Sequence, residues 1–157
     1  MRTVIPAAPL PAVDARPRRV LVVVDEPCAS RAFCATVLRH GSAGALEALV
    51  VAPARDSPAT QWYADEEAAR ADATQRLREC IACLAASGVR ACGRLADPDP
   101  LQAVGDALRE FPADAVLVVT RPLRPSTWLQ ANLVDRVRRS FDLPVEHVVV
   151  EASDRRR

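Results

Sequence analysis

The sequence contains no lysine, only five glycines, and no glycine after Gly105. Without lysine, a Schiff-base amine is excluded as a catalyst. Scarce glycine limits where backbone amides can approach a phosphate closely. Because no run of about 18 apolar residues occurs, we expect no membrane span. The 21 basic and 20 acidic residues leave a net charge of +1, so no basic field indicates nucleic acid binding.

The 157 residues, of which 50% are hydrophobic and 26% charged, predict one packed domain. Prolines interrupt residues 1–17, which favours a disordered leader over the alternative of a cleaved signal peptide. The domain is expected to span Arg18–Glu151, with residues 152–157 as a charged tail. Five cysteines without framework spacing predict reduced thiols and a cytoplasmic protein.

Short apolar runs alternate with helical patterns along the chain. Continuous β-branched runs of this kind are typical of strands buried on both faces of a parallel sheet. The pattern therefore predicts an α/β domain, a three-layer α/β/α sandwich of Rossmann-like type. The expected strands are 20–24, 46–52, 89–95, 116–119 and 145–150, and the expected helices are 28–39, 62–87, 100–110 and one after Thr127.

Ligands of such sheets bind at the carboxyl ends of the strands, near the topological switch point. Asp25 follows the first strand, Asp97 follows the third, and Thr120 begins a proline-rich loop after the fourth. Asp25 is a candidate for ribose or base recognition, and the alternative is an acid that caps a turn.

The loop after the fourth strand carries a second candidate. Arg121 and Arg124 precede Ser126 and Thr127, where the last helix is expected to begin. Arginine beside a helix N-terminus is a sound site for an anion. The alternative is that both arginines are solvated loop residues.

Other reactive side chains form no recognisable site. Cys80 and Cys83 form a CxxC in mid-helix, without two further zinc ligands, so we interpret them as small buried hydrophobic residues. His40 and His147 have no serine or cysteine at triad spacing. Trp128 is expected to pack in the core or an interface, with ligand stacking as the alternative. No metal site and no catalytic residue are predicted.

Several segments, in this order and spacing, resemble the universal stress protein family, as a divergent branch. They are an acidic residue that ends the first strand, a turn after the third, an Ala-Asp pair before the fourth, and a Pro-Val start to the fifth: Asp25, Ala96-Asp97-Pro98, Ala113-Asp114 and Leu143-Pro144-Val145. The resemblance covers about Arg18–Glu151.

The resemblance implies the adenine nucleotide alpha hydrolase-like fold, with a five-stranded sheet in the order 3-2-1-4-5. It also implies a homodimer that pairs along the fifth strand, Val145–Val150. Many members bind ATP through two glycines after the fourth strand and a Gly-Ser pair on the following helix. Here Ala131-Asn132 stand near that pair, and Pro122 and Pro125 lack an N–H donor. ATP binding in the family manner is therefore not expected.

The sequence thus predicts a non-catalytic regulatory or interaction module, dimeric, with no cofactor and with an unidentified protein as a further partner. The alternative is a sensor that binds a nucleotide such as ATP or AMP, or a small anion, in the switch-point pocket. An enzyme of nucleotide chemistry is a third hypothesis, without a supporting motif.

Overall fold

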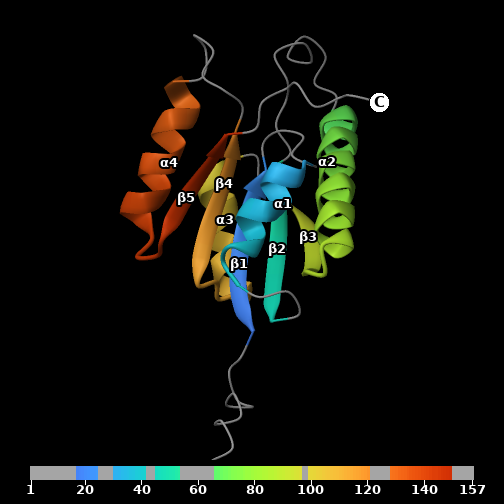
Figure 1. Cartoon of the computed structure of the whole chain (residues 1–157). Coiled ribbons are helices and arrows are strands. Elements are labelled where there is room, and N and C mark those ends of the chain that lie inside the picture. The colour runs from blue at the N-terminus through green and yellow to red at the C-terminus, as the bar shows by residue number, and fades with distance from the viewer. Residues whose placement is uncertain are drawn as a thin grey trace, which may run out of the picture.

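The structure is a computed structural model that describes residues 17–24, 30–41, 45–53, 66–96, 99–120 and 128–149. Strands and helices alternate along these residues (Figure 1). In chain order they are β1 (Arg18–Val24), α1 (Arg31–Leu38), β2 (Leu46–Pro53), α2 (Glu66–Ala86), β3 (Arg90–Ala96), α3 (Pro100–Glu110), β4 (Ala115–Thr120), α4 (Trp128–Ser140) and β5 (Val145–Val149).

All the strand pairs are parallel, and the sheet has the order β3-β2-β1-β4-β5. Both the predicted α/β class and the predicted strand order are confirmed. The central strands β1 and β4 are the continuous apolar runs of the sequence, and from Val20 to Val24 no residue is more than 1% exposed. Burial on both faces explains why these strands lack polar alternation.

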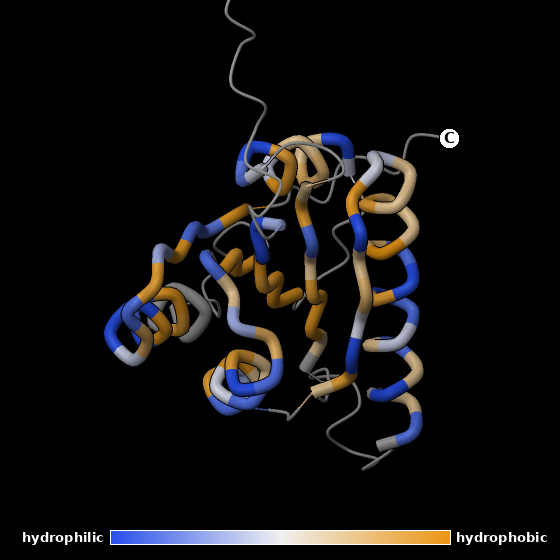
Figure 2. The backbone as a smooth tube through the Cα atoms, turned by 90° about the horizontal axis from the view of Figure 1, so that it is seen from below, coloured by the Kyte–Doolittle hydropathy of each residue, from blue (hydrophilic) through white to orange (hydrophobic). Residues whose placement is uncertain are grey.

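The sheet separates two helical layers (Figure 2). Successive residues of a strand point to opposite faces. Val20, Val22 and Val24 accordingly lie in one core with α1 and α2, whereas Leu21 and Val23 lie in a second core with α3 and α4. The three-layer sandwich is therefore built from two separate hydrophobic cores.

Helix α2 buries the face that its spacing predicts. Its inward residues Ala73, Leu77, Cys80 and Leu84 are all buried, and Ile81 is partly buried against them. The period of three and four residues places these side chains on one helical stripe.

Two glycines fix how α2 ends and how it meets β3. Gly88 has φ 84°, the left-handed conformation that suits glycine after a helix. The amides of Gly88 and Val89 donate to the carbonyls of Ala85 and Leu84, both at 3.0 Å, which closes the last turn. A Cβ on Gly93 of β3 would lie 2.5 Å from Ile81 Cδ1, so this glycine permits the close approach of α2 to the sheet.

Polar caps begin the helices on each layer. The Asp99 carboxylate accepts a hydrogen bond from the Leu101 amide at 3.1 Å, and Pro100 occupies the first turn of α3. Ser30 caps α1 in the same way, because its Oγ accepts from the Phe33 amide at 3.1 Å.

The amino ends of β1 and β4 are joined by polar contacts. The Arg19 amide donates to the Asp114 carboxylate at 2.9 Å, and the Asp114 amide donates to the Arg19 carbonyl at 2.7 Å. The Arg19 guanidinium also pairs with Glu47 of β2 and lies 5.4 Å from the centroid of the Phe111 ring. This edge therefore carries stabilising contacts, opposite the edge where ligands of such sheets bind.

The predicted bounds differ from the observed ones by a few residues at several ends. Helix α1 begins at Arg31, after the extended cap residue Ser30, rather than at residue 28. Helix α2 is described from Glu66 onward, and residues 62–65 lie outside the described residues, so its predicted start stays a prediction. The predicted leader, apart from Pro17, and the predicted tail lie outside the described residues. Within the described part of the chain, no helix is long and apolar enough to cross a membrane.

Candidate functional site

The topology places the switch point between β1 and β4. From β1 the chain crosses through α1 to β2 on one side, and from β4 it crosses through α4 to β5 on the other. Val24, the last residue of β1, pairs with Val119 of β4, and Thr120 pairs with Val149 of β5. A crevice outside these two strand ends is where sheets of this kind hold their ligands.

In the chain, the residues predicted for the site stand at or directly after the carboxyl ends of strands of this sheet. Thr120 is the last residue of β4, and its side chain is outside the described part. Asp25 comes one peptide bond after Val24. Asp25 lies outside the described residues. The same holds for the remaining candidates, which are Asp97, Arg121, Arg124, Ser126 and Thr127.

The described strand ends beneath the candidate site are apolar and fully buried. Val24 and Val119 have no exposed surface, and both belong to the core beneath α1 and α2. The described strand ends thus contribute an apolar base, and the polar recognition expected of the site rests on the residues that follow each strand.

A cavity of about 320 Å³ lies at the carboxyl half of β3, beside α3. Its charged side chains are paired with one another, Arg94 with Glu110 and Arg109 with Asp106 at 3.5 Å. Each cation already has a carboxylate partner, so this cavity offers no uncompensated charge to an anion.

A disulfide joins Cys34 of α1 to Cys83 of α2. The expectation of reduced thiols is therefore wrong for this pair, and Cys80 is disulfide-bonded as well. Cys80 is fully buried as predicted, whereas Cys92 of β3 is free and exposed. Residues 49 positions apart are brought together by the packing of α1 on α2, and cysteine spacing carries no signal of this.

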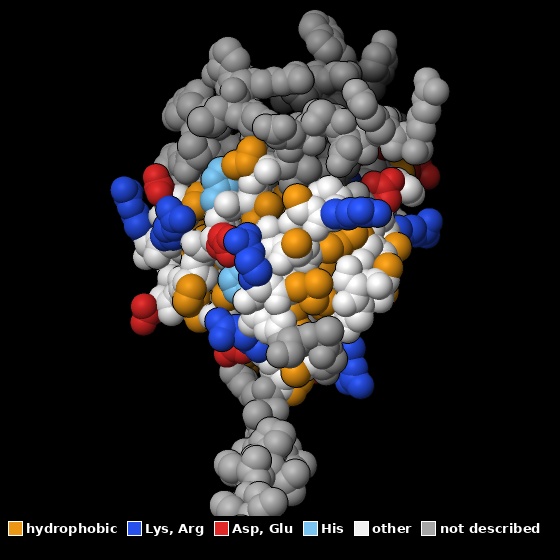
Figure 3. Space-filling model, viewed as in Figure 1, with side chains coloured by type: hydrophobic (Ala, Val, Ile, Leu, Met, Phe, Trp, Pro, Cys, Tyr) orange, Lys and Arg blue, Asp and Glu red, His pale blue; other side chains and the backbone are white. Residues whose placement is uncertain are grey.

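His147 lies in the middle of β5, and His40 contacts Glu146 of the same strand. Figure 3 shows histidine side chains near acidic and arginine side chains. His40 Nε2 lies 2.7 Å from Glu146 Oε2, and Arg39 pairs with the other carboxylate oxygen at 3.5 Å. Burial, and secondarily the charge of Arg138, lowers the pKa of His147. Among the described residues, no cluster of three or more potential ligands could hold a metal ion.

Several solved structures have an architecture similar to that of this chain. A universal stress protein family member from Burkholderia pseudomallei is 19% identical, over 85% of this chain and 97% of its own, with a TM-score of 0.57. A family protein from Arabidopsis thaliana with AMP bound is 15% identical, over 88% and 97% of the chains, with a TM-score of 0.59. A universal stress protein in complex with cAMP is 21% identical, over 88% and 100%, with a TM-score of 0.52.

The chain has a universal stress protein-like fold. The structural similarity covers the whole domain, because the alignments span nearly the full length of each solved structure. No protein-family model matches the sequence, and no curated protein sequence does. The chain is thus a divergent example of the universal stress protein-like fold.

Proposed function

We propose that this universal stress protein-like domain is a non-catalytic regulatory module that does not bind ATP in the family manner. The observation that carries the proposal is the absence of glycine from Asp106 onward, which includes the whole segment after β4. A triphosphate needs several backbone amides at close range, and side chains with a Cβ obstruct that approach. The prolines at 122 and 125 remove two further donors.

A regulatory module acts through partners, and we propose a homodimer along the edge of β5. The edge strand is only partly buried, and Val149 is 50% exposed. Unpaired edges of this kind invite strand pairing with a second copy. The proposal also includes a cytoplasmic location and an unidentified protein that the dimer engages.

Calorimetric titration of the purified full-length chain with ATP and ADP tests the first part. We expect no saturable heat from either nucleotide, together with no nucleotide hydrolysis in a parallel assay. Binding at micromolar Kd, or turnover, would overturn the proposal. Sedimentation equilibrium tests the dimer, with Val149→Glu as the variant expected to shift the mass toward the monomer.

A second candidate function is a sensor for a mononucleotide or a small anion. It is favoured by two neighbours of similar fold, one with AMP bound and one in complex with cAMP. One phosphate makes smaller demands on backbone donors than three, and arginine near a helix N-terminus can supply them. Arg121 and Arg124 are the side chains assigned to this role, and Asp25 is assigned to the ribose.

Thermal-shift measurements with AMP, cAMP and inorganic phosphate separate the two candidates. The sensor requires that one of these ligands raises the melting temperature and that R121A/R124A abolishes the rise. A matched control is Arg109→Ala on α3, whose guanidinium is paired with Asp106. If the double variant keeps the full rise, the assigned anion site is wrong.

A further inference from the structure

The Cys34–Cys83 bond links two helices on the same face of the sheet. Cys34 lies in the N-terminal half of α1, Cys83 lies in the last turns of α2, and their Cα atoms are 6.7 Å apart. This separation is within the range that disulfides span without movement of the backbone.

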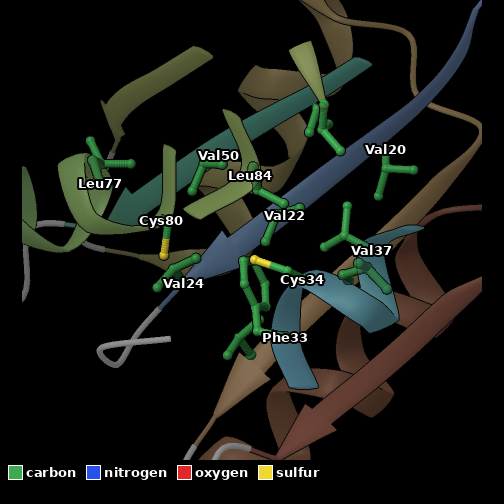
Figure 4. Close-up of a cluster of buried hydrophobic side chains, with 14 of the residues drawn as sticks. Val20, Val22, Val24, Phe33, Cys34, Val37, Val50, Leu77, Cys80 and Leu84 are labelled. Carbon is green, nitrogen blue, oxygen red and sulfur yellow. The ribbon is translucent and has the colours of Figure 1, made fainter. Parts of the chain in front are cut away.

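The two sulfurs differ in their access to solvent. Cys34 is 5% exposed and packs within the buried cluster of Phe33, Val37 and Leu84 (Figure 4). Cys83 is half-buried at the rim of that cluster. A small thiol or disulfide in solution meets Cys83 first, because exchange needs direct contact between the reacting sulfurs.

Cys83 also contacts the start of α1. Its Sγ lies 3.7 Å from the carbonyl oxygen of Ser30, the residue whose Oγ caps the helix. The same sulfur thus touches the cap of α1 and is bonded to Cys34 four residues later. A helix of eight residues gains little from its own hydrogen bonds, so this double attachment holds its first turn.

We propose that Cys34 and Cys83 form a reversible redox pair that exchanges with low-molecular-weight thiols and disulfides of the glutathione class. A redox pair of this kind has one accessible sulfur that attacks and one shielded sulfur that resolves the mixed disulfide. Cys83 and Cys34 have these two positions. This assignment rests on the cytoplasmic location proposed above, where disulfides are typically transient and redox-sensing.

The exchange balances without a further reactant. The Cys83 thiolate attacks one sulfur of the small disulfide, forms a mixed disulfide and expels one small thiolate. The Cys34 thiolate then attacks the Cys83 sulfur, forms the protein bond and expels the second small thiolate. Two protein thiols are oxidised, one small disulfide is reduced to two thiols, and the two protons leave the protein thiols for the expelled thiolates.

The test is differential alkylation of the full-length chain, followed by peptide mass spectrometry, across buffers of defined ratio of reduced to oxidised glutathione. We expect Cys34 and Cys83 to change state together, along a two-electron curve that is the same in both directions. A bond that persists in excess dithiothreitol under native conditions would overturn the proposal, as would thiols that stay reduced in excess oxidised glutathione.

Two variants test the assigned roles. In Cys34→Ser/Cys80→Ser, Cys83 is expected to retain glutathione as a mixed disulfide, since both Cys34 and the neighbouring cysteine of α2 are removed. In Cys83→Ser, the shielded Cys34 is expected to stay unmodified, while exposed Cys92 reacts in both variants as an internal control. Equal labelling of Cys34 and Cys83 would contradict the division of roles, and the wild-type titration remains informative if either variant fails to fold.

Discussion

On one face of the sheet, α1 and α2 pack through aliphatic, aromatic and sulfur-containing side chains, and a disulfide joins the two helices. On the opposite face, the buried side chains of α3 and α4 that the structure describes are hydrocarbon, among them Val104, Leu133 and Val137. The helices on that face have 11 and 13 residues, whereas α1 has eight. A short helix needs tertiary anchoring, and here the anchor is covalent.

This contrast separates two ways of fixing a helix against the same sheet. The α3–α4 face depends on apolar packing and on caps, which do not respond to redox conditions. The α1–α2 face includes the bond that we propose a thiol can break, at the N-terminal end of α1. Environmental sensitivity should therefore be confined to one side of the molecule.

Breaking the disulfide should have the largest effect. A crosslink that closes a loop with a sequence separation of 49 stabilises a protein by about 4 kcal/mol in the chain-entropy model. The free energy of unfolding is measured for the oxidised and the reduced form of each protein. We expect the difference between the two forms to be smaller by about this amount in Cys34→Ala/Cys83→Ala than in the wild type. Urea denaturation measures it, and an unchanged difference would show that the bond carries no stability.

Two glycine substitutions compare the faces directly. Gly93→Ala should destabilise the protein by about 1–3 kcal/mol, since the new Cβ would meet Ile81 Cδ1 at 2.5 Å. Gly105→Ala in α3 meets Phe141 Cζ at 3.6 Å, an ordinary contact, and should stabilise by up to about 1 kcal/mol through helix propensity. Thermal and urea unfolding give both values, and equal signs would contradict the packing described for α2 on β3.

Removing the caps provides a smaller comparison. Ser30→Ala and Asp99→Ala should each cost about 1 kcal/mol, because each leaves a first-turn amide without its acceptor. The cost at Ser30 should change between oxidised and reduced protein, whereas the cost at Asp99 should not. Amide hydrogen exchange of α1 and α3 in both redox states checks this, and a redox-dependent cost at Asp99 would count against a one-sided response.

The smallest effect concerns pH. The pKa of His147 is lowered in the folded state, so the unfolded state takes up a proton first as the pH falls below 6.5. The free energy of unfolding therefore falls as the pH is lowered. Between about pH 7.5 and about pH 5.5, it should fall less for His147→Gln than for the wild type. Other titrating groups are common to both proteins and cancel in the difference. Parallel curves for the two proteins would contradict the lowered pKa.

The fold could be predicted from the sequence because its signals are local and strong. The buried runs of β1 and β4, the inward stripe of α2 and the Asp99-Pro100 start of α3 each follow from periodicity or cap chemistry. The Ser30 cap also had a signal, a serine three residues before Phe33, which was missed. The bounds of α1 differed because its start is set by this cap rather than by the earlier apolar residues.

The disulfide and the His40–Glu146 contact could not be predicted in the same way. Each joins residues far apart in the chain, 49 and 106 positions respectively, through the packing of whole elements. The predicted site is different again, since its location at the ends of β1 and β4 follows from strand order. Its side chains after Val24 and Thr120 stay a prediction.

Amide NMR during ATP titration shows whether the switch-point edge of this universal stress protein-like fold takes a triphosphate. The reporters are the backbone amides of Val24, Val119 and Thr120, which mark the two strand ends. We expect no saturable shift of these signals with ATP. Saturable shifts at these three amides, with micromolar Kd, would contradict it.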